Sequence, residues 1–247
     1  MIKRLALSIV AMIIFMSGCQ KISINRQPAG SYLQPNDKQE QPDDSFNESK
    51  FVVSLDYIRS GASDIFIDLS IEDWNFAKSH FENTKNYFDK SKANLIEKGI
   101  PAELIKKTSL SIEKLQEALK EKNQLEASAQ ANQIYGFICK ILSYYSRPFP
   151  AEVNTMRYYI KEVILKAEIK DIKMLVEALE PSVRLWRDLK TKLNGICEGD
   201  IIIMDSYVDS LNKAVNSKNF EIIKAIAYNI LVHLEVIEMD FTNNQIK

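Results

Sequence analysis

The sequence has few of the residues that build turns, bind metals or form disulfides. Its 247 residues include only 7 Gly, 7 Pro, 3 Cys and 2 His. So little glycine leaves scant capacity for loops that cradle phosphate, and the sequence has no Gly-rich phosphate loop, no G-x-S-x-G and no Ser/His/Asp set. His80 and His233 lack metal-ligand spacing. We therefore expect no metal, no cofactor and no catalytic residue.

The charge balance excludes another class of function. The chain has 32 Lys and Arg against 33 Asp and Glu, which gives a formal net charge of −1. A nucleic-acid-binding domain carries a marked basic excess on one face or along one helix. We therefore expect no nucleic-acid partner.

The first nineteen residues contain a long apolar run. Residues 1–4 are M-I-K-R, residues 5–16 form an apolar run, and Ser17-Gly18-Cys19 follows. Secretory apolar regions have ~7–15 residues, whereas a membrane-spanning helix needs ~20. The length of the run therefore favours a cleaved signal peptide over a membrane span.

This segment resembles the bacterial lipoprotein signal, with Met16-Ser17-Gly18-Cys19 as the lipobox. Met16 stands where that class usually has Leu. The resemblance implies that residues 1–18 are removed and that lipid such as palmitate is attached to Cys19. It also implies an extracytoplasmic location, anchored to a bacterial membrane through Cys19. Two or more acyl chains give stable anchoring, whereas one gives only marginal binding.

Residues 19–50 differ in composition from everything that follows. The segment from Gln20 to Lys50 has three prolines, much Gln, Asn, Ser and Asp, and few residues able to build a core. Such a composition is typical of a disordered linker. We predict a lipidated tether over residues 19–50.

From Phe51 onward, apolar residues recur at alternating spacings of three and four, which indicates amphipathic helices packed in bundles. The clearest series is Phe220, Ile223, Ala227, Ile230, Leu234, Ile237 and Phe241. No alternation of β-branched residues competes with this pattern. The fold class predicted is all-α, with antiparallel helical bundles.

Turn and capping residues divide the body into eight helices. Ser70, Asp171, Asn123 and Asn219 are the expected N-caps, since Ser, Asp and Asn side chains accept hydrogen bonds from the first turn of a helix. The stretch Arg147-Pro148-Phe149-Pro150 cannot continue a helix and is the strongest internal boundary. The predicted helices cover residues 51–69, 70–97, 102–121, 123–146, 151–168, 171–195, 201–217 and 219–242.

The two halves of the body show weak internal similarity. At a shift of 98 residues, Arg59 meets Arg157 and Phe88 meets Trp186. At a shift of 96, Lys122-Asn123 meets Lys218-Asn219. Two amphipathic helices align by heptad alone, but the shared Lys-Asn break and the nearly constant offset favour an internal duplication. We predict two similar four-helix units, over residues 51–147 and 148–247.

The best candidate for a binding site lies near the boundary between the halves. Tyr and Arg are favoured in binding hot spots. The alternative is that these residues only hold the two halves together. The candidate binding residues are Tyr144, Tyr145, Arg147, Phe149, Arg157, Tyr158 and Tyr159.

These features predict a non-catalytic protein-interaction module of the cell envelope, with another envelope protein as partner. The alternative is a lipoprotein that binds a small ligand or solute in a pocket in or between the bundles. The disulfide question stays open, because Cys139 and Cys197 lie on different segments and are able either to pair or to stay as small buried thiols.

Overall fold

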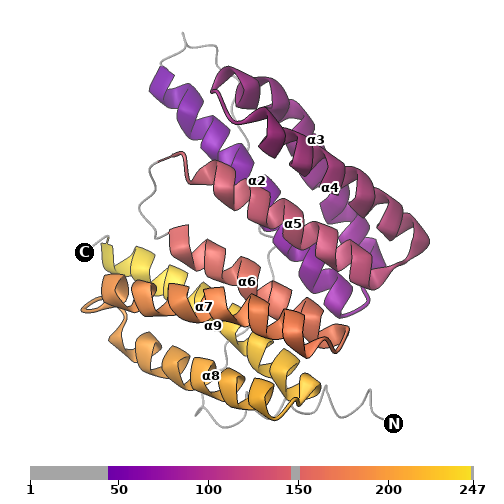
Figure 1. The fold of residues 1–247 in the computed structure, drawn as a ribbon. Coiled ribbons are helices and arrows are strands. Elements are labelled where there is room, and N and C mark those ends of the chain that lie inside the picture. Colours follow the sequence, from indigo (N-terminus) through magenta and orange to yellow (C-terminus); the bar gives the residue numbers. More distant parts are fainter. Residues whose placement is uncertain (1–43, 146–150, 246–247) are drawn as a thin grey trace, which may run out of the picture. The chain divides into compact units, whose positions relative to one another are not determined.

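The computed structural model describes residues 44–145 and 151–245, and the regular elements in these ranges are all α-helices (Figure 1). The signal segment, Cys19, Arg147 and Phe149 lie outside the described residues. Within those ranges no helix is both long and apolar enough to cross a membrane. In chain order the helices are α2 (Asp44–Ser70), α3 (Trp74–Glu97), α4 (Ala102–Glu121), α5 (Gln124–Leu142), α6 (Ala151–Glu168), α7 (Ile172–Leu193), α8 (Glu198–Asn216) and α9 (Phe220–Gln245).

Several boundaries differ from those predicted: α3 begins at Trp74 instead of residue 70, α5 ends at Leu142 instead of residue 146, and α9 ends at Gln245 instead of residue 242. Helix α2 begins at Asp44, inside the segment that we assigned to the tether. Extending an existing helix adds a hydrogen bond for each residue fixed, so polar residues join a helix already formed by the buried positions from Phe51 onward. Helix α8 begins at Glu198 instead of residue 201.

Three of the four predicted N-caps are confirmed. Asn123, Asp171 and Asn219 accept hydrogen bonds from the backbone N–H groups of Glu126, Met174 and Ile222, at 3.2, 3.0 and 3.2 Å. These bonds satisfy donors that a helix start otherwise leaves unpaired.

The prediction for Ser70 is wrong. Ser70 belongs to the end of α2, where its hydroxyl donates to the Ile67 carbonyl at 2.6 Å. The N-cap of α3 is Asp73, which accepts from the Phe76 N–H at 3.2 Å. A hydroxyl at a helix end bonds back along its own helix as readily as forward, so sequence alone did not separate the two roles.

Four helix ends pass through a left-handed residue that is not glycine. These residues are Glu72, Lys122, Lys170 and Lys218, with φ of 61°, 55°, 57° and 54°. Each is followed directly by one of the four N-cap residues, so an αL residue and an Asp or Asn cap form the same turn four times. The turn recurs at offsets of 98 and 96 residues.

The helices of each half pack in the same order. In the first half, α2 packs against α3 and α5, and α4 packs against α5; in the second, α6 packs against α7 and α9, and α8 packs against α9. The halves meet mainly through α5 and α6, and side chains of α2 also contact α6. The described residues 44–145 and 151–245 belong to one compact unit. The predicted core series of α9 is buried from Ile223 to Phe241, while Phe220 is half-buried.

Candidate functional site

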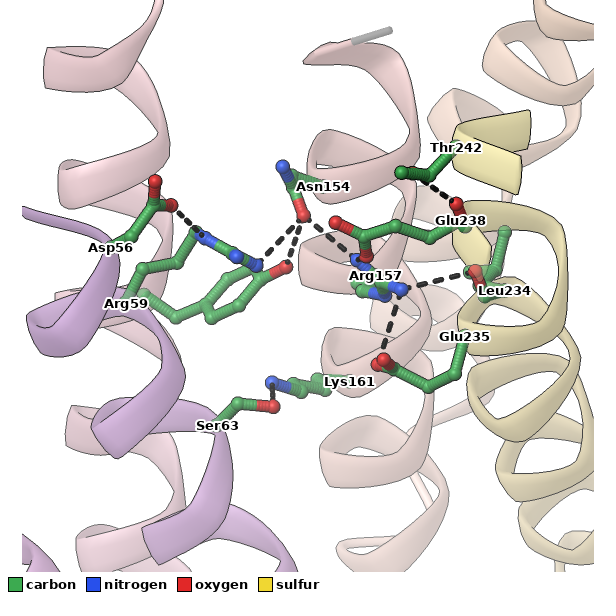
Figure 2. Close-up of polar contacts among 11 residues, drawn as sticks. Asp56, Arg59, Ser63, Asn154, Arg157, Lys161, Leu234, Glu235, Glu238 and Thr242 are labelled. Atoms are coloured by element: carbon green, nitrogen blue, oxygen red, sulfur yellow. Dashed lines mark hydrogen bonds and ion pairs between the residues drawn. The ribbon is translucent and has the colours of Figure 1, made fainter. Parts of the chain in front are cut away.

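The most concentrated group of buried charges lies where α2, α5, α6 and α9 meet. Arg157 and Lys161 of α6 are 2 % and 1 % exposed. Arg59 of α2 is nearly as covered, with 15 % of its side chain exposed. Figure 2 shows these three cations lying side by side with acidic and amide partners. Burying a charge is costly unless it is paired and hydrogen-bonded, so the partners decide what this cluster does.

Asn154 is the centre of the cluster. Its Oδ1 accepts three hydrogen bonds, from Arg59 Nη1 at 2.9 Å, Arg157 Nη1 at 2.9 Å and the Tyr135 hydroxyl at 3.1 Å (Figure 2). The donors come from three different helices, so one amide oxygen ties α2 and α5 to α6. Arg59 is held from its other side by Asp56, which accepts from Nε at 3.1 Å.

Arg157 joins α6 to α9. Its Nη2 donates to the Leu234 carbonyl at 3.0 Å and lies 3.1 Å from Glu235 Oε1, and its Nη1 lies 2.6 Å from Glu238 Oε2. Burial disfavours the charged form, but Tyr135, Glu235 and Glu238 outweigh burial and raise the pKa of Arg157. The guanidinium therefore stays charged while buried.

Lys161 has no carboxylate among its direct partners. Its Nζ donates to Ser63 Oγ at 2.8 Å and lies 3.9 Å from the centre of the Tyr135 ring and 5.5 Å from that of Phe66. Its pKa is lowered to about 7, chiefly by burial and also by Arg157 and Arg59, while Cys139 and Glu235 act in the opposite direction. This amine therefore changes charge near neutral pH while a lysine in water does not.

The same environment holds the neighbouring acids neutral. Burial raises the pKa of the Cys139 thiol to about 11 and that of the Tyr135 hydroxyl above its ordinary value, although Arg59 opposes both shifts. Cys139 and Cys197 are both free thiols in this structure. A thiol with a raised pKa stays protonated at neutral pH, and the protonated form is a poor nucleophile.

The predicted binding residues do not gather on one surface. Arg157 faces α9, whereas Tyr158 of the next position faces α5, where its hydroxyl accepts from Gln133 Nε2 at 3.1 Å. The Tyr145 ring packs edge-on against Phe51, and Tyr144 is 57 % exposed. The Tyr159 ring packs edge-on against that of Tyr158.

Sequence analysis missed Asn154, Lys161 and Tyr135. The available indication was the alignment of Arg59 with Arg157, because a cationic residue repeated at an otherwise buried register needs buried partners. Helix periodicity alone did not provide those partners, since they come from four different helices.

Other arrangements of polar groups among the described residues are less connected. An open surface depression of about 310 Å³ is lined by Lys170 and residues 217–221. In the described ranges no group of three or more His, Cys, Asp or Glu side chains is placed to hold a metal ion. The buried cluster therefore ties four helices together.

Exposed apolar side chains form a row on the outer face of α9. Ile222, Val232 and Met239 are 48 %, 66 % and 57 % exposed. They share this face with exposed Ala225 and with half-buried Asn229 and Val236, at spacings of three and four residues. We call these six positions, 222, 225, 229, 232, 236 and 239, the α9 outer face. It lies opposite the buried row of α9.

Comparisons with protein-family models, with curated proteins and with solved structures found no match to this chain.

Proposed function

We propose that this chain is a lipid-anchored, extracytoplasmic protein of the bacterial envelope that acts by binding another protein and not by catalysis. Its folded body consists of two antiparallel four-helix units that arose by duplication. The carrying observation is the α9 outer face, an apolar row exposed on the last helix.

Several details support the duplication beyond the helical period. The left-handed residues Glu72 and Lys170 are 98 positions apart, as are the caps Asp73 and Asp171 that follow them. The left-handed glycines Gly99 and Gly195 are 96 apart. Any two amphipathic helices share a heptad, but they do not share the position of a left-handed residue and its cap.

The lipid anchor is supported by the lipobox-like sequence ending at Cys19. Growth of the host with a palmitate analogue is expected to label the wild-type chain and not the Cys19→Ser variant, and the variant is expected to leave the membrane fraction. An unlabelled wild-type chain, or a Cys19→Ser chain with full label, would contradict the anchor.

The exposed apolar side chains of α9 support an interaction role. An apolar row that stays exposed along a whole helix marks a surface at which another molecule packs, whereas scattered apolar residues need no explanation. The row lies on regular helix, so its side chains are already positioned before binding, which lowers the entropic cost of association.

Site-specific photo-crosslinking in the host tests the interaction role. A photoreactive amino acid at Met239 is expected to give one dominant adduct with an envelope protein. The matched control is Glu180 of α7, whose side chain is 70 % exposed but polar. Absence of an adduct at Met239, or the same adducts at both positions, would overturn the interaction role.

A further inference from the structure

The centre of the α9 outer face has a counterpart in the first half that another helix covers. At the offset of 96 residues, Gly136 corresponds to Val232 and Gln133 to Asn229. This register is fixed by buried pairs, with Ile134 and Ile230 both fully buried at the same offset. Around Gly136 and Gln133, α5 packs against α6, whereas the ends of the equivalent face, at positions 126, 140 and 143, are exposed.

One helix covers the face of α5, and its contacts show how. A side chain at Gly136 would place its Cβ 2.7 Å from two ring carbons of Tyr158, so the ring occupies the space that glycine leaves. Asn132 Nδ2 donates to Glu162 Oε1 at 2.7 Å, and Gln133 Nε2 donates to Tyr158 Oη at 3.1 Å. Tyr158 and Glu162 are one helical turn apart on α6.

The α9 outer face is therefore the position that a following helix occupies in the first half. Tandem helical arrays usually end in a unit with a polar outer face, because an apolar end is poorly soluble. Here the last helix carries Val232 where α5 has Gly136, and both the bulk and the apolar character increase at that position. Within the described residues, α9 therefore presents an apolar packing surface, and no later helix covers it.

The charges beside this face select the kind of partner. The acidic residues of α9 are Glu221, Glu235, Glu238 and Asp240, against Lys224 as its one lysine or arginine. Lys224 is bound by Glu168 at 2.7 Å and by Glu221 at 3.1 Å. Glu221 and Glu235 keep 78 % and 63 % of their side chains exposed at the margin of the row. The cations that pair with them, Lys224 and Arg157, are each shared with a second acid, so negative charge remains in excess. Basic flanks on a partner would complement them.

A second copy of this chain supplies fewer of those charges. By the same repeat logic it would present α2, which has only two basic residues, Lys50 and Arg59. Arg59 is already held by Asp56 and Asn154. A partner helix with basic residues along both flanks would therefore complement the acidic margin better than α2 of a second copy.

We infer that the α9 outer face is a docking site for one amphipathic helix of a partner protein, with an apolar stripe that packs on Val232 and Met239 and Lys or Arg residues flanking it. This inference rests on the interaction role proposed above and names its partner. The binding mode is a helix laid along an apolar helix face, read through positions spaced by three and four residues.

Binding of two designed peptides to the full chain in phosphatidylcholine vesicles tests this inference. Both probes are helical peptides of about 21 residues with the same Leu stripe, flanked by Lys in one and by Glu in the other. Binding to vesicles without protein is subtracted from each. The Lys-flanked peptide is expected to bind at least about tenfold more tightly than the Glu-flanked one.

The matched variants are Val232→Lys and Val176→Lys, since Val176 is also an exposed valine, 49 % exposed on α7. Val232→Lys is expected to weaken the Lys-flanked peptide by at least about tenfold and Val176→Lys to leave it unchanged. Circular dichroism confirms that both variants keep the wild-type helix content.

Equal binding of both peptides, or no loss in Val232→Lys, would overturn the helix-docking inference. So would self-association of the chain that Val232→Lys abolishes, because a second copy would then be the occupant. These outcomes are separate from the crosslinking test, since an adduct at Met239 with a partner that presents no basic helix supports the interaction role and contradicts only this inference.

Discussion

Helices α5 and α9 hold equivalent places in the packing order of the two halves, but their outer faces differ in how far another helix covers them. The centre of the α5 face is covered by α6 and has a glycine where the Tyr158 ring lies, whereas the α9 face has exposed Val232 at that position. The buried rows of the two helices keep register, so the core is shared and the outer face differs. The contrast shows that two helices in equivalent places keep the same buried inner face, while the outer face of each differs with the neighbour that it meets.

The largest expected effect comes from the two arginines at equivalent positions. Arg157→Leu should lower the free energy of unfolding by about 2–3 kcal/mol, because it removes the donor to the buried Leu234 carbonyl and the ion-pair partner of half-buried Glu238. Arg59→Leu should cost less, about 1–2 kcal/mol, since its partner Asp56 is half-exposed and Arg157 still donates to Asn154. Urea denaturation measures both. Equal losses would show that Arg59 and Arg157 contribute equally to the stability of the fold.

The next effect depends on pH and on one residue found only in the second half. Position 161 is Lys where the first half has Ser63, and burial lowers the pKa of Lys161 to about 7. Between that pH and the ordinary lysine pKa the unfolded chain binds more protons than the folded chain, so stability rises with pH. The groups facing the amine are Arg59, Asp64, Cys139, Arg157 and Glu235.

Lys161→Met removes this one titration and leaves those neighbours in place. We expect the wild type to gain about 2 kcal/mol relative to the variant between pH 7 and pH 9, with the variant relatively most stable at pH 7 and below. Urea denaturation of both proteins at several pH values measures the difference. A difference that is constant across this range would show that Lys161 does not titrate there.

Exchange of the residues that distinguish α5 from α9 gives a moderate effect. Gly136→Val should lower stability by about 1–3 kcal/mol, because its side chain would meet the Tyr158 ring. Val232→Gly should cost roughly 0.5 kcal/mol, the difference in helix propensity at an exposed site. Thermal unfolding compares the two. A large loss in Val232→Gly would mean that α9 is covered within the chain itself.

The smallest effect should be the same in both halves. Asp73→Ala and Asp171→Ala each remove one N-cap hydrogen bond of a repeated turn, so each should cost about 1 kcal/mol. Differential scanning calorimetry of the two variants measures this cost. A difference larger than about 1 kcal/mol between them would show that the two turns are not equivalent.

The sequence predicted the helices well because their evidence is local. The spacing of apolar residues placed the core positions of α9, and Asn123, Asp171 and Asn219 were found as caps since a cap acts within three residues of itself. The failure at Ser70 has the same origin, because two local hydrogen bonds competed and only the position of the neighbouring turn decided between them.

The candidate site was predicted far less well. The sequence singled out Arg157 because arginine is favoured in binding sites. However, Arg157 was expected to lie together with Tyr158 on a binding surface. The two side chains leave α6 toward different helices, Arg157 to α9 and Tyr158 to α5. Neighbours in sequence diverge on a helix by about 100° for each residue, so a cluster in the sequence is not a cluster in space.

By itself, the sequence determined the helical class, most helix ends and the inner faces, because hydrophobic period and capping depend on residues within one or two turns. Tertiary structure alone decided that Asn154 collects donors from three helices, that Lys161 is buried beside Tyr135, and that α5 is covered where α9 is open. The reason is physical: burial and charge pairing depend on which helices meet, and residues as much as 98 positions apart make those contacts.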